Sequence, residues 1–342
     1  MTSETRENAA ASAERPHART ALEADAPGGR LRWSVPATQA AAVGYAALQT
    51  WWSLGHAPSF GRFGTDLLVV PHWGVAVLCL AAAALAHGLR TAAGPNRGLL
   101  GASWAVSGVL LVSCPLLLLD VVGALIPGLR IPHNLPGALS RAACFAVAAL
   151  LFSCAAAYRR SRWGGCPCCS RTGEPLSAEP TRPPRWAWWA AYGAVASCWL
   201  RIVAQYGLGW GSPGHLDPAE EVSLAVFEAG FVMAGTLLPL SLVHGWGRVF
   251  PRWVPLLARR RVPRRLLLPP AAGLSVGLLV YFGVGIGQLV GETIRPRPHP
   301  GSLPLSFLWV AMPAYWLWGL GLGVAAVSYH RRTRRPCRVC GR

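Results

Sequence analysis

The chain has 342 residues, of which 53% are hydrophobic and only 13% are charged, and its mean hydropathy is +0.35. A soluble domain of this length needs roughly a quarter charged residues to cover its surface, so the composition excludes an ordinary soluble protein. The formal net charge is +18, and all 32 basic residues are arginine. These arginines lie between apolar blocks, which favours a role in membrane topology over nucleic-acid binding.

Residues 1–35 mix small, charged, proline and glycine residues without apolar periodicity, which predicts a disordered cytosolic N-terminus. No apolar core follows an N-terminal basic cluster, so we expect no signal peptide. Eight apolar blocks follow, most of them long enough to span ~30 Å of hydrocarbon with ~20 residues. They run over 38–54, 67–89, 99–125, 137–158, 186–206, 222–246, 266–293 and 303–329.

The first four blocks and the last four carry the same landmarks in the same order. The matched pairs are VGYAA at Val43–Ala47 with YGAVA at Tyr192–Ala196, LAHGLR at Leu85–Arg90 with LVHGWGR at Leu242–Arg248, VGALI at Val122–Ile126 with VGETI at Val290–Ile294, PHNLP from Pro132 with PHPGSLP from Pro298, and YRRSRWGGCPCC from Tyr158 with YHRRTRRPCRVC from Tyr329. Because each half holds an even number of spans, both halves have the same orientation, which is typical of parallel repeats.

The sequence therefore predicts an all-α integral membrane bundle with eight transmembrane helices in two parallel four-helix repeats. The first repeat covers 36–169, a cytosolic linker covers 170–184, and the second repeat covers 185–342. Arginines concentrate before block one, after the even-numbered blocks and in the tail, whereas the opposite connections hold only Arg62, Arg130, Arg295 and Arg297. The positive-inside rule then places both termini in the cytosol and the chain in the plasma membrane, against anionic lipid headgroups.

Ten cysteines fall into two groups. The five within apolar blocks, which we interpret as small packing residues, are Cys79, Cys114, Cys144, Cys154 and Cys198. The other five are predicted to be cytosolic and are Cys166, Cys168, Cys169, Cys337 and Cys340. In each half, the first cytosolic cysteine lies eight residues after a tyrosine, and the second of the pair lies three residues further on.

Two C-x-x-C turns can supply the four thiolates of a tetrahedral zinc site. We therefore predict that Cys166, Cys169, Cys337 and Cys340 bind one structural zinc ion, with Cys168 a spare or an alternative to Cys169. A closed shell of four thiolates leaves no position for substrate, which argues against a catalytic metal. Two alternatives stay open: the same pairs could act as a membrane thiol-disulfide oxidoreductase, or they could be unligated thiols.

Ionisable and polar residues within the blocks form a second set of candidates, since such groups are costly in a membrane. They are Asp120, Arg141, Arg201, Glu228, Gln288 and Glu292. Arg201 and Glu228 fall at similar depth, as do Asp120 and Arg141, which favours two structural ion pairs. The alternative is a small-molecule permease, in which these residues form an outward-facing polar site between the repeats.

The chain carries no Walker motif, no G-x-S-x-G and no H-E-x-x-H, so we expect no enzyme of those classes. With arginine as its only basic residue, and with WWSLG at Trp51–Gly55 and FGTDLLV at Phe63–Val69, the chain resembles multi-pass membrane proteins of high-GC actinobacteria. That resemblance implies a membrane location and no particular activity. The sequence alone predicts a transporter-like protein or an accessory scaffold of unknown substrate.

Overall fold

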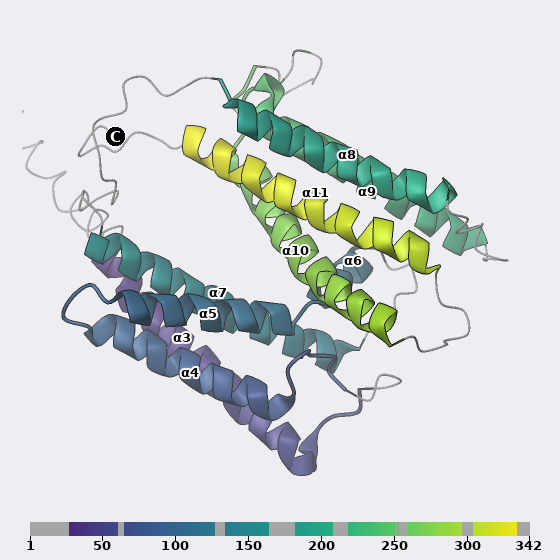
Figure 1. Ribbon diagram of the computed structural model, residues 1–342. Coiled ribbons are helices and arrows are strands. Elements are labelled where there is room, and N and C mark those ends of the chain that lie inside the picture. Colours follow the sequence, from purple (N-terminus) through teal and green to yellow (C-terminus); the bar gives the residue numbers. More distant parts are fainter. Residues whose placement is uncertain are drawn as a thin grey trace, which may run out of the picture. The chain divides into compact units, whose positions relative to one another are not determined.

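The computed structural model describes residues 27–60, 65–126, 134–163, 182–207, 218–250, 252, 259–295 and 304–333. Within these ranges the regular secondary structure is helical, apart from one isolated antiparallel bridge, so the all-α prediction is confirmed for this part of the chain. The α-helices are α3 (Pro27–Trp51), α4 (His72–Thr91), α5 (Arg97–Ser113), α6 (Leu117–Leu125), α7 (Leu135–Trp163), α8 (Arg185–Gly207), α9 (Pro218–Val243), α10 (Arg264–Ile294) and α11 (Leu305–Arg332) (Figure 1).

Five of these helices are long and apolar enough to cross a membrane, namely α4, α7, α9, α10 and α11. The pair α5 and α6 adds a sixth span if its two pieces count as one. The chain thus has the helices of a multi-pass membrane protein. Helices α3 and α8 are not among these spans, since α3 carries Gln39 and Gln49 and α8 carries Arg201 and Gln205 within their apolar blocks. The count of eight spans stays a prediction.

The first helix begins at Pro27, inside the segment that we expected to be disordered up to residue 35. Proline at the first position of a helix costs little, since the amide that it lacks would have no partner there. The π-helix η1 (Trp52–His56) follows α3 and ends the apolar block near its expected boundary. Residues 1–26 lie outside the described ranges.

The described residues divide into two compact units. The first contains α3, α4 and α5 with most of α7, and the second contains α6 and α8 to α11.

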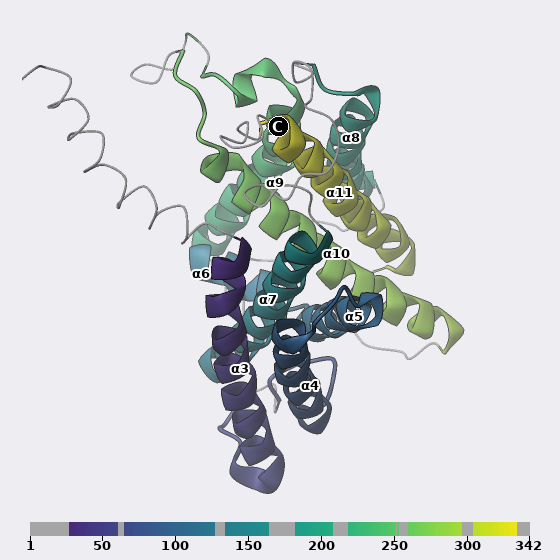
Figure 2. The same ribbon diagram turned by 90° about the vertical axis from the view of Figure 1, so that its left-hand side faces the viewer.

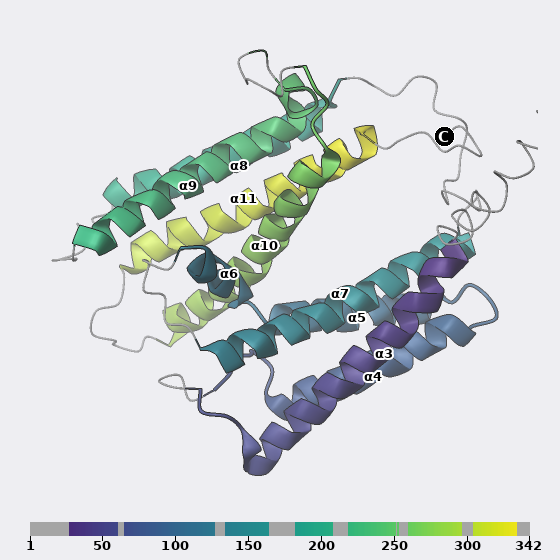
Figure 3. The same cartoon turned by 180° about the vertical axis from the view of Figure 1, so that it is seen from behind.

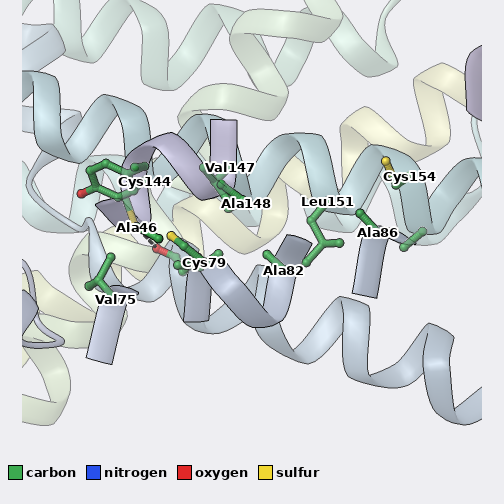
Figure 4. Close-up of a cluster of buried hydrophobic side chains, with 14 of the residues drawn as sticks. Ala46, Val75, Cys79, Ala82, Ala86, Cys144, Val147, Ala148, Leu151 and Cys154 are labelled. Atoms are coloured by element: carbon green, nitrogen blue, oxygen red, sulfur yellow. Dashed lines mark hydrogen bonds between the residues drawn. The ribbon is translucent and has the colours of Figure 1, made fainter. Parts of the chain in front are cut away.

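The core of the first unit is rich in alanine and cysteine (Figure 4), which pack with fully buried leucines and with Tyr158. Cys79, Ala82 and Ala86 of α4 are fully buried, as are Ala148 and Leu151 of α7. Large apolar side chains point the other way: the exposed set on α4 and α7 includes Trp73, Val77, Leu80, Leu139 and Phe152. Small residues inside and large ones outside is the arrangement that lets membrane helices approach closely while lipid solvates the outer face. Figure 2 shows α3, α4, α5 and α7 grouped in this bundle.

The third apolar block is broken, whereas we expected one continuous span over 99–125. The break lies at Pro115, which has no amide N–H and so cannot continue the hydrogen bonds of α5. Other groups satisfy the carbonyls that this leaves: the Cys144 thiol donates to Leu110 O at 3.3 Å, and Val69 N donates to Ser113 O at 3.0 Å. The short α6 beyond the break packs beside α10 in the second unit (Figure 3).

In the second unit, α11 lies between α8 and α10 (Figure 1) and depends on glycine for both contacts. Gly319 and Gly323 face α10, where the Ser275 hydroxyl donates to Gly319 O at 2.7 Å. Gly321 faces α8, where a Cβ at this position would lie 2.5 Å from the carbonyl oxygen of Ala190. The two helix pairs therefore touch backbone to backbone, as small-residue spacing allows.

We predict that Gly321→Ala destabilises the protein by ~1–3 kcal/mol, because its methyl group collides with backbone that cannot rotate away. Thermal unfolding in detergent would report this as a lower midpoint. Gly273→Ala is the matched control, since a Cβ there meets no atom within 4 Å on an exposed helix face. Equal midpoints for the two variants would contradict the close approach of α8 and α11.

Candidate functional site

The predicted zinc ligands Cys166, Cys169, Cys337 and Cys340, together with Cys168, lie outside the described residues. Within the described residues, no group of three or more His, Cys, Asp or Glu side chains could hold a metal ion. The five cysteines of the apolar blocks are free, buried thiols packed among alanine, leucine and valine side chains. This environment fits the packing role that we expected for them.

The structure brings Arg201 and Glu228 together in the second unit. Arg201 Nη1 lies 3.8 Å from Glu228 Oε1, and Gln205 Nε2 donates to the same oxygen at 2.9 Å. Arg201 and Gln205 are four residues apart on α8, so their side chains share one face of that helix. Gln205 was not among the residues predicted from the sequence. Its spacing from Arg201 was the available signal.

Aromatic rings enclose the Arg201 guanidinium. Its Cζ lies 5.6 Å from the ring centroids of both Phe231 and Tyr315, and Phe282 stacks on Tyr315 at 4.0 Å. Ring faces carry negative potential, so they stabilise a cation that has been removed from water. Arg201 is only 7% exposed, yet its Nε and the Oε1 of Gln205 are buried atoms without a hydrogen-bond partner in the described part of the chain.

The other four predicted residues are distributed over both units. Arg141 is buried in the first unit, where its Nη1 donates to the backbone oxygen of Asp66 at 2.6 Å. Asp120 lies half-buried in the first turn of α6, in the second unit. Gln288 and Glu292 lie one turn apart on an exposed face of α10. The pairing of Asp120 with Arg141 stays a prediction.

A buried polar network in the first unit is the site that sequence reasoning missed. At its centre is Asp66, which is 3% exposed although it lies in the irregular segment between η1 and α4. Ser140 Oγ donates to Asp66 Oδ2 at 2.8 Å, and Gln49 Nε2 lies 3.4 Å from the same oxygen. Tyr45 completes the network, with its hydroxyl 2.8 Å from Ser140 Oγ and 2.7 Å from Gln49 Nε2.

His72 connects this network to its partly exposed edge. Its Nδ1 lies 2.6 Å from Gln49 Oε1 and 3.6 Å from Asp66 Oδ2, and its side chain is 26% exposed. Leu67, next to Asp66, has φ 57°, a left-handed conformation that costs a leucine of order 1–3 kcal/mol. The network offsets this strain by holding the segment against α3 and α7. The arrangement holds the Asp66 carboxylate in an apolar bundle, with His72 at its partly exposed edge.

Two tyrosines, one at the end of each unit's last helix, make the same hydrogen bond. Tyr158 of α7 donates to Gly94 O at 2.7 Å, and Tyr329 of α11 donates to Gly247 O at 2.9 Å. Gly94 lies just beyond the end of α4, and Gly247 lies just beyond the end of α9. An arginine from the next turn adds a second contact: Arg162 donates to Ala92 O and Arg332 to Leu242 O. The ends of α7 and α11 are thus anchored where α4 and α9 end.

Aligning these tyrosines brings the buried faces of α7 and α11 into register. The pairs buried in both helices are Ser140 with Ala311, Val147 with Trp318, Ala148 with Gly319, Leu151 with Leu322, Cys154 with Ala325, Ala155 with Ala326, Ala157 with Ser328, and Tyr158 with Tyr329. The VGYAA and YGAVA landmarks align α3 with α8 equally well. The pairs buried in both of those helices are Thr38 with Ala187, Ala42 with Ala191, Tyr45 with Ala194, and Gln49 with Cys198.

Compared with models of known families, with curated proteins and with solved structures, the chain matches none.

We predict that Asp66→Ala destabilises the protein by ~1–3 kcal/mol, because it leaves the buried Ser140 hydroxyl and Gln49 amide without their acceptor. Asp66→Asn keeps an acceptor of the same size and should cost less. Thermal unfolding in detergent distinguishes the two variants. If Asp66→Ala left the midpoint unchanged, the network would not hold the segment in place.

Proposed function

We propose that this protein is an integral membrane scaffold of eight spans in two parallel repeats, joined on the cytosolic side by one structural four-cysteine zinc site. In this proposal the protein catalyses no reaction. The zinc site holds the two repeats of its transporter-like bundle together. The observation that carries the proposal is the matched tyrosine anchor at the ends of α7 and α11.

Each anchor fixes the point from which a cysteine pair leaves its bundle. Cys166 follows Tyr158 by eight residues, and Cys337 follows Tyr329 by the same number. Eight residues reach at most ~26 Å at ~3.3 Å per residue. Two such tails can cover the width of a helical bundle whose neighbouring helices lie ~8–10 Å apart. A shared register of buried residues in α7 and α11 further supports an origin by duplication.

The residue types fit zinc. Four thiolates around Zn²⁺ give a tetrahedral site with a net charge of about −2, and the arginines that surround both cysteine pairs offset this charge. The matched spacing favours a metal over redox chemistry, since the cytosol keeps unligated dithiols reduced.

Metal analysis of the purified full chain tests the proposal. We expect about one zinc per chain, which is the stoichiometry of one tetrahedral four-thiolate site, and its loss in Cys166→Ser and Cys337→Ser. Cys168→Ser is the matched control and should keep its zinc if Cys169 is the ligand, as predicted; loss of zinc in Cys168→Ser would identify Cys168 as the ligand instead. A metal-free protein that forms a reversible Cys166–Cys169 disulfide would support the oxidoreductase alternative instead.

The enclosed Arg201 site favours a second candidate, a permease for a small neutral molecule. Arg201 and Glu228 balance each other's charge, so an ionic ligand gains little there. The unpartnered Nε–H of Arg201 and the unpartnered Oε1 of Gln205 offer one donor and one acceptor beside aromatic rings. An aromatic amide presents the complementary acceptor and donor.

Benzamide is a direct probe of this second candidate. If the site binds amides, benzamide should raise the midpoint of thermal unfolding of the wild type, by mass action on the folded state. The rise should vanish in Gln205→Leu, which removes the acceptor, and persist in Glu292→Gln on the exposed face of α10. No rise in the wild type, or an equal rise in Gln205→Leu, would remove the candidate.

A further inference from the structure

Two buried thiols of the first unit meet where the third apolar block breaks. Cys114 is the residue that follows α5, and Cys144 lies on α7. Their side chains are within hydrogen-bonding range of each other. Both also approach one acceptor, the carbonyl oxygen of Leu110, which lies 3.5 Å from Cys114 Sγ and 3.3 Å from Cys144 Sγ. A packing role alone does not account for two thiols that converge on one oxygen.

The backbone at Cys114 is free of the helix and so has room to adjust. Its φ of −117° and ψ of 53° lie outside the helical region, and its amide donates to Leu111 O at 3.3 Å. A disulfide needs the two Cβ atoms ~3.5–4.5 Å apart and a specific torsion about the sulfur–sulfur bond. A residue at a helix break reaches such a geometry more easily than one held inside a helix.

The two thiols differ in access. Cys114 is 4% exposed, whereas Cys144 is fully buried. An oxidant therefore meets Cys114 first, and Cys144 is placed to react with the product. Because both thiols lie in an apolar bundle, the oxidant that suits them is small and uncharged. Hydrogen peroxide has both properties, and it converts exposed thiolates to sulfenic acids that a neighbouring thiol turns into disulfides.

A positive charge lies beside the pair. Arg141 precedes Cys144 by three residues on α7, so the two side chains share a face of that helix. Its Nη1 donates to Asp66 O at 2.6 Å, and its charge is close enough to interact with Cys114. A guanidinium at this position stabilises the negative charge on a sulfur that attacks a peroxide.

The predicted topology places the pair near the outer surface of the membrane. Cys114 lies 17 residues after Arg97, the first residue of α5, which is roughly 26 Å at ~1.5 Å per residue. With Arg97 on the cytosolic side, this distance crosses most of the ~30 Å of hydrocarbon. Disulfides persist on that side, because the reductants of the cytosol do not reach it. This step alone rests on the orientation in the proposed function.

We infer that Cys114 and Cys144 are a redox-active dithiol that hydrogen peroxide converts into a disulfide. The Cys114 sulfur attacks one peroxide oxygen and breaks the O–O bond, which gives a sulfenic acid, and the other oxygen leaves with the thiol proton as water. The Cys144 sulfur then attacks the sulfenic sulfur, and the hydroxyl leaves with the Cys144 proton as a second water. The two thiols lose two electrons, and the peroxide gains them.

Oxidation changes what holds the break. In the reduced protein the Cys144 thiol donates to Leu110 O. The disulfide has no S–H group, so this hydrogen bond is lost and a covalent bond joins the end of α5 to α7 instead. The site thus couples the redox state of the two cysteines to the contact between these helices.

Peptide mass spectrometry of the full chain, purified in a neutral detergent and reduced with dithiothreitol, tests the inference. Hydrogen peroxide is the probe, and buffer alone is the blank. After proteolysis without reductant we expect two peptides joined through Cys114 and Cys144, lighter than the free peptides by the mass of two hydrogen atoms. Dithiothreitol should separate them again. The inference is overturned if peroxide joins no such peptides in the wild type.

Cys144→Ser tests the order of the two steps. Its hydroxyl can donate to Leu110 O as the thiol does, so the fold is retained. Without the second thiol, Cys114 should stop at the sulfenic acid, which dimedone captures, whereas the wild type should show little capture. Cys114→Ser should abolish both the disulfide and this capture. Equal capture at Cys114 in Cys144→Ser and in the wild type would show that Cys144 does not react with the sulfenic acid, and would overturn the inference.

Cys79→Ala is the matched control. Cys79 is another fully buried thiol of the first unit, on α4, and it lies near Cys144 (Figure 4). Alanine is common in this core, so the variant should fold and should form the Cys114–Cys144 disulfide as the wild type does. Loss of that disulfide in Cys79→Ala would also overturn the inference. The result is independent of the zinc site, whose predicted ligands lie elsewhere in the sequence.

Discussion

Polar groups inside an apolar bundle must find their hydrogen-bond partners within the protein, since lipid offers none. Asp66, the carbonyls released by Pro115 and the hydroxyls of Tyr158 and Tyr329 each satisfy this requirement in a different way. Asp66 draws donors from α3 and α7. The released carbonyls accept from a thiol and from a backbone amide. The two tyrosines bond to the connections that follow α4 and α9. Together these contacts decide how the irregular segments are held.

The choice of buried side chains in both units is the one expected for helices surrounded by lipid. Because lipid is as apolar as a leucine side chain, burying large side chains gains little, and close contact between helices gains more. Cys79, Ala82 and Ala86 bring α4 against its neighbours, and Gly321 brings α11 against α8. The large side chains that a soluble protein would bury, such as Val77 and Trp73, instead remain on the surface. The sequence shows where each apolar block lies, but it does not show which face of the helix is buried, because both faces are apolar.

Sequence reasoning located most helices within a few residues, because arginine, proline and glycine bound the apolar blocks. It placed α10 at 266–293, and the helix runs over Arg264–Ile294. Pro313 lies inside the continuous helix α11, whereas Pro115 breaks the block that we expected to be continuous over 99–125. The difference lies in what surrounds each proline, and a single sequence does not show this.

The candidate sites divide in the same way. Arg201 and Glu228 could be paired from depth alone, since they lie on consecutive helices that run in opposite directions. Asp66 could not be recognised, because it lies at the edge of a block and its partners Gln49 and Ser140 come from helices 17 residues before it and 74 residues after it. The cysteine pairs had the clearest signal in the sequence and lie outside the described residues.

The break at Pro115 affects the order in which the helices can pack during synthesis. The segment beyond it, α6, is synthesised with the helices of the first unit but packs against α10 of the second, where Leu118 contacts Gly277. Until α10 emerges from the ribosome, α6 has no partner within its own unit. A chain severed between α7 and α8 would therefore not yield two independent halves. The N-terminal fragment would contain α6 without its packing partner α10, and the C-terminal fragment would lack α6.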